Sequence, residues 1–298
     1  MPSKNPEQAD HRPVLVRLRA AMPELRPSEW RIASYFVSNP RDAAMAPIGE
    51  VAQKCQTSTT SVVRFSKRFG YQHLRALRHD VLRDALREEV ITESLPESGG
   101  DLSPGASMRE VVDNIRHSEV LSINETADAL DLTALRAAID ALATAQRIVI
   151  FGLGASSFVG LDLQQKLIRI GVTALNCPDP HGAWTVAATL DDQAVAVAIS
   201  HSGTTRDTVE FLQIAARHEA ATIAITNHDS SALAAAAEVV LTTAARETQM
   251  RSGALGSRIA QLMVVDCLFL GLAQRDYERS ATMLKQTWSA VHERGLHH

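Results

Sequence analysis

Ala194-Val-Ala-Val-Ala-Ile199 is followed without interruption by Ser200-His-Ser-Gly-Thr-Thr205. The first stretch holds only small and β-branched residues, which is typical of a strand buried on both faces of a parallel sheet. The second stretch is a short polar loop, and a helical pattern of apolar residues begins at Asp207. This order of strand, loop and helix presents backbone N–H groups and the positive end of a helix dipole beside several hydroxyl groups.

The loop contains no lysine, so its donors are neutral, and they favour one small phosphate group over a nucleoside triphosphate. The alternative is a hydroxyl-rich helix cap without a ligand, because serine and threonine are ordinary N-cap residues. Four hydroxyl groups and a glycine within six residues exceed what one cap needs, and the sequence therefore favours an anion site. The candidate ligand residues in this loop are Ser200, His201, Ser202, Thr204 and Thr205.

Outward from this stretch, apolar runs alternate with helical patterns. This alternation predicts right-handed crossovers and an α/β doubly wound, five-stranded parallel sheet covered by helices on both faces. Ligands of such sheets bind at the carboxyl ends of the strands, near the point where the strand order reverses. Strands are expected at Arg147–Phe151, Val172–Asn176, Ala194–Ile199, Thr222–Thr226 and Val239–Thr242.

A second glycine- and serine-rich loop, Gly152-Leu-Gly-Ala-Ser-Ser157, follows the first expected strand. Its candidate ligand residues are Gly154, Ser156 and Ser157. The loop also partly matches a dinucleotide-binding fingerprint, but Ser157 stands at the third glycine position. The second expected strand ends at Asn176-Cys177, where a carboxylate for the ribose would be expected. A dinucleotide is therefore the weaker alternative for this site.

The N-terminal third of the chain has helical patterns only. Ser28 is expected to cap the helix that carries Trp30, and Asn39-Pro40 is expected to end that helix. A helix near Pro47, a short turn at Cys55-Gln56-Thr57 and a third helix from Ser58 to Phe69 follow. Two short helices joined by a short turn predict an all-α helix-turn-helix domain.

In the third helix, Val62, Phe65 and Phe69 are expected to point inward. Small hydroxyl side chains at its start would let it enter a major groove, where Arg64 would read guanine and Lys67 and Arg68 would contact phosphates. The alternative is a solvated basic face on a three-helix bundle. The candidate DNA-binding residues are Ser58, Thr59, Thr60, Ser61, Arg64, Lys67 and Arg68.

The charges of the 298-residue chain are unevenly distributed. Residues 1–90 hold 15 Lys and Arg against 10 Asp and Glu, a net charge of +5, whereas residues 91–298 hold 15 against 24, a net charge of −9. A basic first part suits a polyanionic partner. Three scattered cysteines without a CxxC pair predict neither a metal site nor a disulfide, and the N-terminus lacks an apolar signal core. We expect a cytoplasmic protein with no contact to a membrane.

The composition predicts a helix-turn-helix domain at residues 13–90, a linker at 91–107 and a sheet domain at 108–290. Residues 92–107 are rich in Ser, Gly, Pro and Glu, as linkers are. Two helical patterns, Met108 to about Leu130 and Leu132–Leu142, precede the first strand. These helices would cover the sheet or form a subunit interface.

Five motifs carry a resemblance to known families. Gly152-x-Gly-x-Ser156, Ser200-x-Ser-Gly-x-Thr205 and Glu247-x-x-x-Arg251-Ser-Gly-Ala-Leu-x-Ser-Arg-Ile-Ala-Gln261 resemble the SIS (sugar isomerase) phosphosugar-binding domain. Upstream, Leu25-Arg-Pro-Ser-Glu29 and Thr60-x-x-Val63-Arg-Phe-Ser-Lys-Arg-Phe-Gly70-Tyr resemble the N-terminal domain of RpiR-type transcription regulators. The resemblance spans roughly residues 15–285, and the combination of both domains is more specific than any single motif.

The resemblance implies a DNA-binding transcription regulator of carbohydrate metabolism that senses a sugar phosphate. By the pattern of the family, Ser156, Ser200, Ser202 and Thr205 would hold the phosphate, and Glu247 would approach the sugar hydroxyls. His201 and Arg251 are further candidates for the ligand. The resemblance implies no catalytic residue, metal or cofactor. Such regulators are typically homodimers or homotetramers, and two-fold dimers would bind a palindromic operator.

Two alternative functions agree with part of the sequence. An aldose–ketose sugar-phosphate isomerase on the same fold would use Glu247 as its base, but no confident partner for ring opening is found among the histidines. An isomerase also has no use for a basic helix-turn-helix, so we predict that the protein is not an enzyme. A repressor that senses a nicotinamide dinucleotide would keep the DNA function and change only the ligand.

Overall fold

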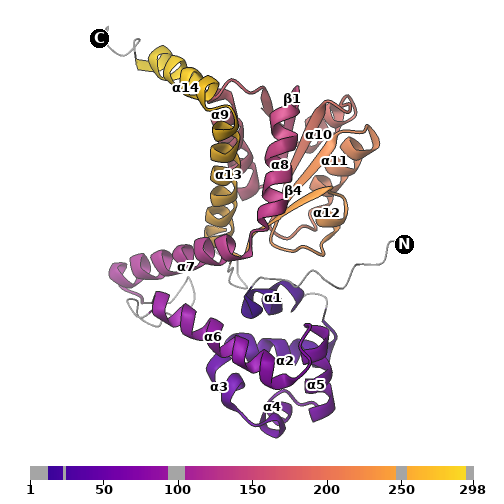
Figure 1. Ribbon diagram of the computed structural model, residues 1–298, viewed down its shortest axis with the longest axis vertical. Coiled ribbons are helices and arrows are strands. Elements are labelled where there is room, and N and C mark those ends of the chain that lie inside the picture. The colour runs from indigo at the N-terminus through magenta and orange to yellow at the C-terminus, as the bar shows by residue number, and fades with distance from the viewer. Residues whose placement is uncertain (1–12, 23–24, 93–104, 246–253, 293–298) are drawn as a thin grey trace. The chain divides into compact units, whose positions relative to one another are not determined.

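A computed structural model describes residues 13–22, 25–92, 105–245 and 254–292 of the chain (Figure 1). The chain divides into two compact units between His117 and Ser118. This division falls inside α7 (Met108–Ala129), whereas the sequence placed a linker at residues 91–107. The first two residues of that predicted linker continue helix α6, and residues 93–104 lie outside the described residues. The predicted domain boundaries stay a prediction.

The described part of the first unit is all-helical before α7. Its core gathers apolar side chains from every helix around Phe36 and Phe65, whose ring centroids lie 6.4 Å apart. The predicted all-α fold of this part of the chain is confirmed. The helices are α1 (Val14–Ala21), α2 (Pro27–Ser38), α3 (Pro40–Met45), α4 (Ile48–Lys54), α5 (Thr59–Arg68) and α6 (Leu74–Thr92).

One local prediction in this unit is wrong, and one helix was not predicted. Helix α2 begins at Pro27 with Arg26 in the N-cap position, so Ser28 is not the cap; the Glu29 carboxylate instead accepts a hydrogen bond from the Arg26 backbone N at 3.3 Å. The sequence also missed α3. Pro40 ends the preceding helix, as predicted, but it also starts the next one, because proline suits the first helical position.

The second unit alternates strands and helices after the last turns of α7. All strand pairs are parallel, and the strand order is β2-β1-β3-β4-β5. The predicted five-stranded parallel sheet is confirmed. Its elements are α8 (Leu132–Thr144), β1 (Arg147–Gly152), α9 (Ala155–Arg169), β2 (Ala174–Asn176), α10 (Pro180–Ala187), β3 (Ala194–Ile199), α11 (Arg206–Arg217), β4 (Ala221–Thr226), α12 (Ala232–Ala235), β5 (Val239–Thr242), α13 (Leu255–Arg275) and α14 (Tyr277–His292).

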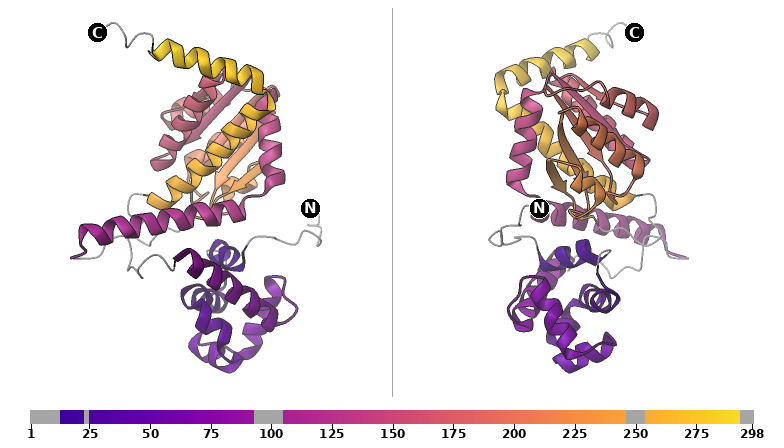
Figure 2. Two further views of the ribbon diagram at one scale, coloured as in Figure 1. Left: turned by 60° about the vertical axis from the view of Figure 1, so that its left-hand side comes forward. Right: turned by 90° about the vertical axis from the view of Figure 1, so that its right-hand side faces the viewer.

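The two faces of the sheet have different cores, and Figure 2 shows the helical layers on either side of the strands. Toward α8, α9 and α13 the strands present branched side chains such as Ile150, Val197 and Ile223. Toward α10, α11 and α12 the central strand β3 presents only alanines. Among the described helices α13 alone is long and apolar enough to span a membrane, but its buried side chains belong to the first of these cores.

The last turns of α7 are tied to the sheet just after β5. The Thr126 hydroxyl, fully buried, accepts a hydrogen bond from the Ala244 backbone N at 3.0 Å. Ser122, one turn earlier, is also fully buried. This half of α7 therefore packs against the chain that leaves the carboxyl end of β5.

Replacing Thr126 with valine should destabilise the second unit. Valine has the same shape but no hydroxyl, so the buried Ala244 N–H would lose its acceptor at a cost of about 1–3 kcal/mol. Chemical denaturation measures the loss. Thr126→Ser keeps the acceptor and is the matched control, which should retain most of the wild-type stability. Equal stability of all three proteins would contradict the assignment of this helix to the sheet.

Candidate functional site

The candidate ligand site lies where the strand order reverses. β1 and β3 pair in register from Arg147↔Ala194 to Gly152↔Ile199, so both strands end side by side. From β1 the chain crosses to β2, which lies on one side of β1, and it then returns to β3, which lies on the other side of β1. The loops that follow β1 and β3 therefore start from neighbouring positions at a topological switch point, where open α/β sheets bind their ligands.

In the loop after β1, Gly154 has φ of +60° and precedes the first residue of α9. Helix α9 has no side-chain cap. Ser156 is only 4% exposed, and its hydroxyl lies 3.3 Å from Oε1 of Gln261, which comes from α13. The Ser157 hydroxyl donates to the Gly154 carbonyl at 2.7 Å. Of the two serines, Ser156 is thus tied to another element, whereas Ser157 closes its own turn.

In the loop after β3, the hydroxyls are linked in pairs. Ser200 Oγ lies 3.0 Å from Thr205 Oγ1 and accepts a hydrogen bond from the Gly203 N–H at 3.2 Å. Ser202 Oγ accepts from both the backbone N (3.3 Å) and the hydroxyl (3.1 Å) of Thr204. Thr205 is the N-cap residue of α11, yet its side chain makes no capping hydrogen bond. A simple hydroxyl cap therefore does not account for this cluster.

Gly203 allows this loop to close. Its φ is +63°, and an added Cβ would collide with the Ser231 side chain and lie 2.8 Å from Thr226 Oγ1. Its carbonyl accepts a hydrogen bond from the Leu233 N–H at 2.9 Å, while the neighbouring His201 carbonyl accepts one from Asn227 N at 3.0 Å. The loop is thereby anchored to the chain that follows β4, and only glycine fits at position 203.

Two histidines flank the loop. The rings of His201 and His228 lie 5.9 Å apart, edge to face, and both side chains are partly buried. His201 is a predicted ligand residue. His228 is not predicted from the sequence, because it follows β4 in a stretch without any motif. Only the neighbouring positions of β3 and β4 in the sheet bring it beside His201.

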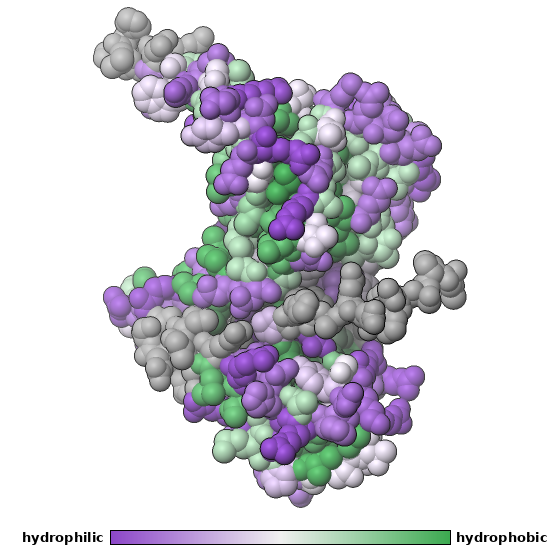
Figure 3. Space-filling model, viewed as in Figure 1, coloured by the Kyte–Doolittle hydropathy of each residue, from purple (hydrophilic) through white to green (hydrophobic). Residues whose placement is uncertain are grey.

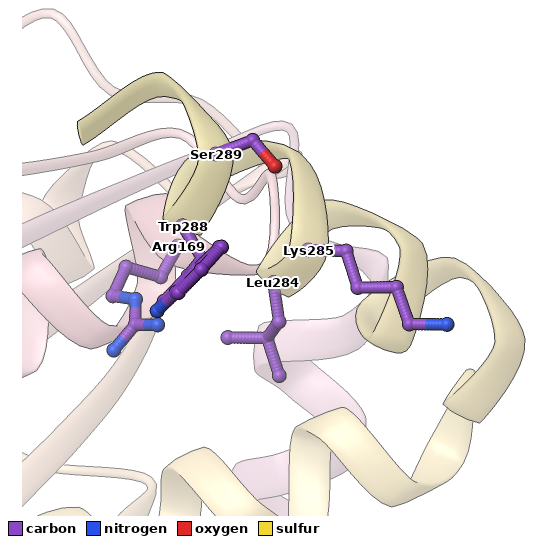
Figure 4. Close-up of a pocket in the computed structure, with 5 residues that line it drawn as sticks. All are labelled: Arg169, Leu284, Lys285, Trp288 and Ser289. Atoms are coloured by element: carbon purple, nitrogen blue, oxygen red, sulfur yellow. The ribbon is translucent and has the colours of Figure 1, made fainter. Parts of the chain in front are cut away.

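Two predicted ligand residues, Glu247 and Arg251, lie outside the described residues. A cavity of about 490 Å³ is lined by residues of α9 and α14, including Arg169 and Trp288 (Figure 4). Arg169 lies 13 residues after Ser156 on α9, about 20 Å along the helix. This cavity is therefore separate from the two loops. Within the described ranges, no three His, Cys, Asp or Glu side chains gather to hold a metal ion.

The second candidate site is α5, which follows α4 after the turn at residues 55–58. Val62 and Phe65 are fully buried, and Phe69 packs on Phe65 with ring centroids 4.9 Å apart. The opposite face is open, as the sequence predicted. Ser58 caps the helix through a hydrogen bond from Ser61 N at 3.1 Å. Exposed side chains along this face are Ser58, Thr59, Thr60, Arg64, Lys67 and Arg68, with Ser61 partly exposed.

The turn and one end of this face are held by α2. Gln56 has φ of +48°, a conformation in which glycine is more usual, and the Arg31 guanidinium donates to the carbonyls of Cys55 and Gln56 at 2.8 and 3.0 Å. Arg68 lies 2.6 Å from a Glu29 carboxylate oxygen. Arg68 thus forms an ion pair with Glu29 of α2, whereas Arg64 and Lys67 are exposed positive charges on α5 without such a partner among the described residues.

Comparison with known proteins adds to this geometry. Residues 13–87 match the family model described as "Helix-turn-helix domain, rpiR family", and residues 141–271 match the SIS domain. An uncharacterized HTH-type transcriptional regulator of Caldanaerobacter subterraneus is 32% identical over 92% of this chain and 95% of its own length. This chain belongs to the RpiR family of HTH-type transcriptional regulators. The predicted family is confirmed.

Two solved structures resemble this RpiR-family protein. The Vibrio vulnificus NanR protein complexed with ManNAc-6P has a TM-score of 0.59 and 27% identity, covering 93% of this chain and 97% of that one. A putative sugar-phosphate isomerase from Listeria monocytogenes has a TM-score of 0.54 and covers 63% of this chain and all of that one. Its identity is 19%, so this second likeness concerns the fold alone.

Gly203→Ala should destabilise the protein in the absence of any ligand. The substitution places a side chain at positive φ against Ser231 and Thr226, at a cost of about 1–3 kcal/mol. Denaturant unfolding measures the change. Gly49→Ala is the control, because Gly49 lies in α4 with no atom within 4 Å of an added Cβ; this variant should keep or slightly raise the stability. Wild-type stability of Gly203→Ala would contradict the tight packing of the loop.

Proposed function

We propose that this protein is a transcription regulator whose binding to DNA responds to a sugar phosphate. The observation that carries the proposal is the convergence of two uncapped helix starts, α9 and α11, at the switch point of a sheet in a chain that also carries an exposed basic helix. Backbone N–H groups at such helix starts bind anions well. The domains we propose are a DNA-binding domain at residues 13–90, a linker at 91–107 and a ligand domain at 108–290.

The phosphate would be held by hydroxyls of the two loops. Ser156, Ser200, Ser202 and Thr205 are the proposed donors, together with backbone N–H groups of both helix starts. Ser157 and Thr204 shape the turns around them, and His201 is a further candidate for the ligand. NanR of Vibrio vulnificus, a relative of similar length, was solved with ManNAc-6P; this supports a phosphosugar as the effector class. Glu247 and Arg251 are proposed to contact the sugar.

We infer a regulator rather than an enzyme, acting in the cytoplasm. The relatives of similar length are named as transcriptional regulators, although some proteins with this fold are named as putative isomerases. An isomerase needs a base that moves a proton between adjacent carbons. The proposed base, Glu247, would have to be shown to support turnover. Isomerase assays on the phosphosugar that binds would therefore reverse this inference if they found product.

The proposed DNA interface is the open face of α5. Arg64 would read bases while Lys67 and Arg68 contact phosphates, and Ser58, Thr59, Thr60 and Ser61 would approach the groove. We further propose a homodimer or homotetramer bound to a palindromic operator. Exposed apolar side chains support an oligomer: Phe158, Leu161 and Ile168 on α9 are 66, 51 and 48% exposed, and Figure 3 shows other apolar residues at the surface.

In this scheme, a bound ligand changes the geometry between subunits and hence the spacing of their α5 helices on DNA. A ligand can do so only through a difference in its affinity for the two arrangements. Operator affinity measured with and without saturating effector tests the coupling. Unchanged affinity would refute regulation by the ligand and leave the DNA interface standing.

One sugar phosphate should raise the melting temperature of the protein, and its unphosphorylated parent sugar should not. A ligand at a hundred times its dissociation constant adds about 2.7 kcal/mol of stability. Ser200→Ala should weaken binding of that ligand about 10- to 100-fold, because it removes a donor to the charged phosphate. Ser289→Ala, on α14 at the separate cavity, is the matched control. A shift with NAD(H) alone would instead establish the dinucleotide alternative.

Arg64→Ala should weaken binding to a DNA site selected from random sequences by the wild-type protein. We expect a loss of about 10-fold or more together with relaxed sequence preference, because a bidentate base contact is removed. Lys67→Ala should weaken all sequences alike and lower the salt slope by about one. Fluorescence anisotropy measures both effects. Arg136→Ala is the control, because it removes the same charge from an exposed side chain on α8. Wild-type affinity of Arg64→Ala would refute the proposed interface.

A further inference from the structure

The Gln261 carboxamide is one of several buried polar groups of the second unit with an atom that lacks a hydrogen-bond partner among the described residues, and it contacts a proposed phosphate ligand, Ser156. Gln261 lies on α13, is 1% exposed and accepts a hydrogen bond at Oε1 from the Ser156 hydroxyl. Its Nε2 is buried and has no hydrogen-bond partner among the residues that the structure describes. A buried amide N–H without an acceptor is costly, and native proteins rarely keep one without a reason.

The direction of this hydrogen bond matters to an anion. A serine hydroxyl has one proton, and in the structure that proton is given to Gln261. An ionised phosphate oxygen accepts hydrogen bonds and has no proton to donate. Ser156 therefore cannot hydrogen-bond to a phosphate while it donates its own proton to Gln261. The conflict disappears when the carboxamide rotates by a half-turn, because Nε2 then donates to Ser156 Oγ. The Ser156 proton is then free for the anion, and an N–H of Gln261 gains an acceptor while Oε1 gives up the hydrogen bond from Ser156.

We propose that Gln261 is a positioning residue that sets the direction of the Ser156 hydroxyl. With the site empty, Ser156 donates to Gln261; with a phosphate bound, Gln261 donates to Ser156 and Ser156 donates to the phosphate. Consecutive hydrogen bonds of this kind strengthen one another. The half-turn is sterically simple, because the O and N atoms of a carboxamide are nearly equal in size and the terminal torsion of glutamine is broad.

This inference rests on the proposed phosphate site and adds a consequence for α13. Lys166 of α9 pairs with both Asp162 on its own helix and Asp266 of α13. Helices α9 and α13 are therefore joined by a surface ion-pair group as well as by the buried Ser156–Gln261 contact. The ion pairs of Lys166 do not change when a phosphate binds, whereas the hydrogen bond between Ser156 and Gln261 then exchanges donor and acceptor.

Gln261→Met tests the proposal, because methionine has nearly the same shape and neither polar atom. Phosphosugar affinity, measured by titration calorimetry with the panel member that shifts the wild type, should fall about 10-fold, as it should for Ser156→Ala. The double variant should lose no more than Ser156→Ala alone, since Gln261 acts only through that hydroxyl. Without ligand, Gln261→Met makes two opposed changes, because an unpaired buried N–H is gone while the buried Ser156 hydroxyl loses its acceptor.

Gln261→Glu distinguishes positioning from simple packing. A carboxylate accepts hydrogen bonds and does not donate them, so it holds the Ser156 proton and repels the phosphate. We expect a loss of affinity about 100-fold or greater, with binding partly recovered at low pH as the carboxylate is protonated. Gln261→Asn restores the donor on a shorter chain and should bind better than Gln261→Glu.

The outcomes separate the two levels of the proposal. Wild-type affinity of Gln261→Met, or additive losses in the double variant, would overturn the role of Gln261 and leave the phosphate site in place. A wild-type protein that binds none of the sugar phosphates, nor inorganic phosphate, would overturn the phosphate site and the role of Gln261 together. Equal phosphosugar affinities of Gln261→Glu and Gln261→Met would assign the residue to packing and overturn positioning.

Discussion

The in-register pairing of β1 with β3 is the constraint on which the ligand site depends. It brings Gly152 opposite Ile199, so two loops that are far apart in the sequence leave the sheet at neighbouring positions. Neither loop alone surrounds an anion. Together they bring two helix starts and a set of hydroxyls to neighbouring positions at one edge of the sheet, with their backbone fixed by the strands behind them. Parallel pairing produces this because every strand ends on the same edge of the sheet.

The unequal faces of the sheet support the same geometry. Ala194, Ala196 and Ala198 of β3 face the layer of α10, α11 and α12, where short side chains let helices lie close to the strands. Phe211 of α11 fills part of this layer against Phe151, with ring centroids 5.5 Å apart. The helix that begins at the loop is thus held by an aromatic pair, and the position of its first turn is fixed relative to β1.

The sequence predicted this sheet well because its central strands β1, β3 and β4 are buried on both faces. The bounds of β3 and β5 agree with the structure to the residue, since uninterrupted apolar runs end abruptly in polar loops. Predictions failed where a local signal has two meanings. Pro40 ends one helix and starts another, and a serine in a first helical turn resembles a cap whether or not it stands in the cap position. At the site, the hydroxyl loops were predicted from local composition. His228 and the role of Gln261 were not, because each depends on which distant element the fold places beside it.

The difference between the loops and Gln261 bears on how a sensor of this kind can work. A ligand shifts an equilibrium only by the difference in its binding free energy between two states, so contacts that are equally available in both states give affinity without response. The backbone N–H groups at the starts of α9 and α11 follow the paired strands β1 and β3. In the proposed site they would contribute affinity that is the same in both states. Ser156 and Gln261 differ, because their hydrogen bond must reverse before the hydroxyl can serve an anion, and an N–H of Gln261 gains its acceptor in the same step. Groups whose partners change on binding are where a response can arise, and this pair joins the phosphate loop to α13, a helix that packs against α8, α9 and α14.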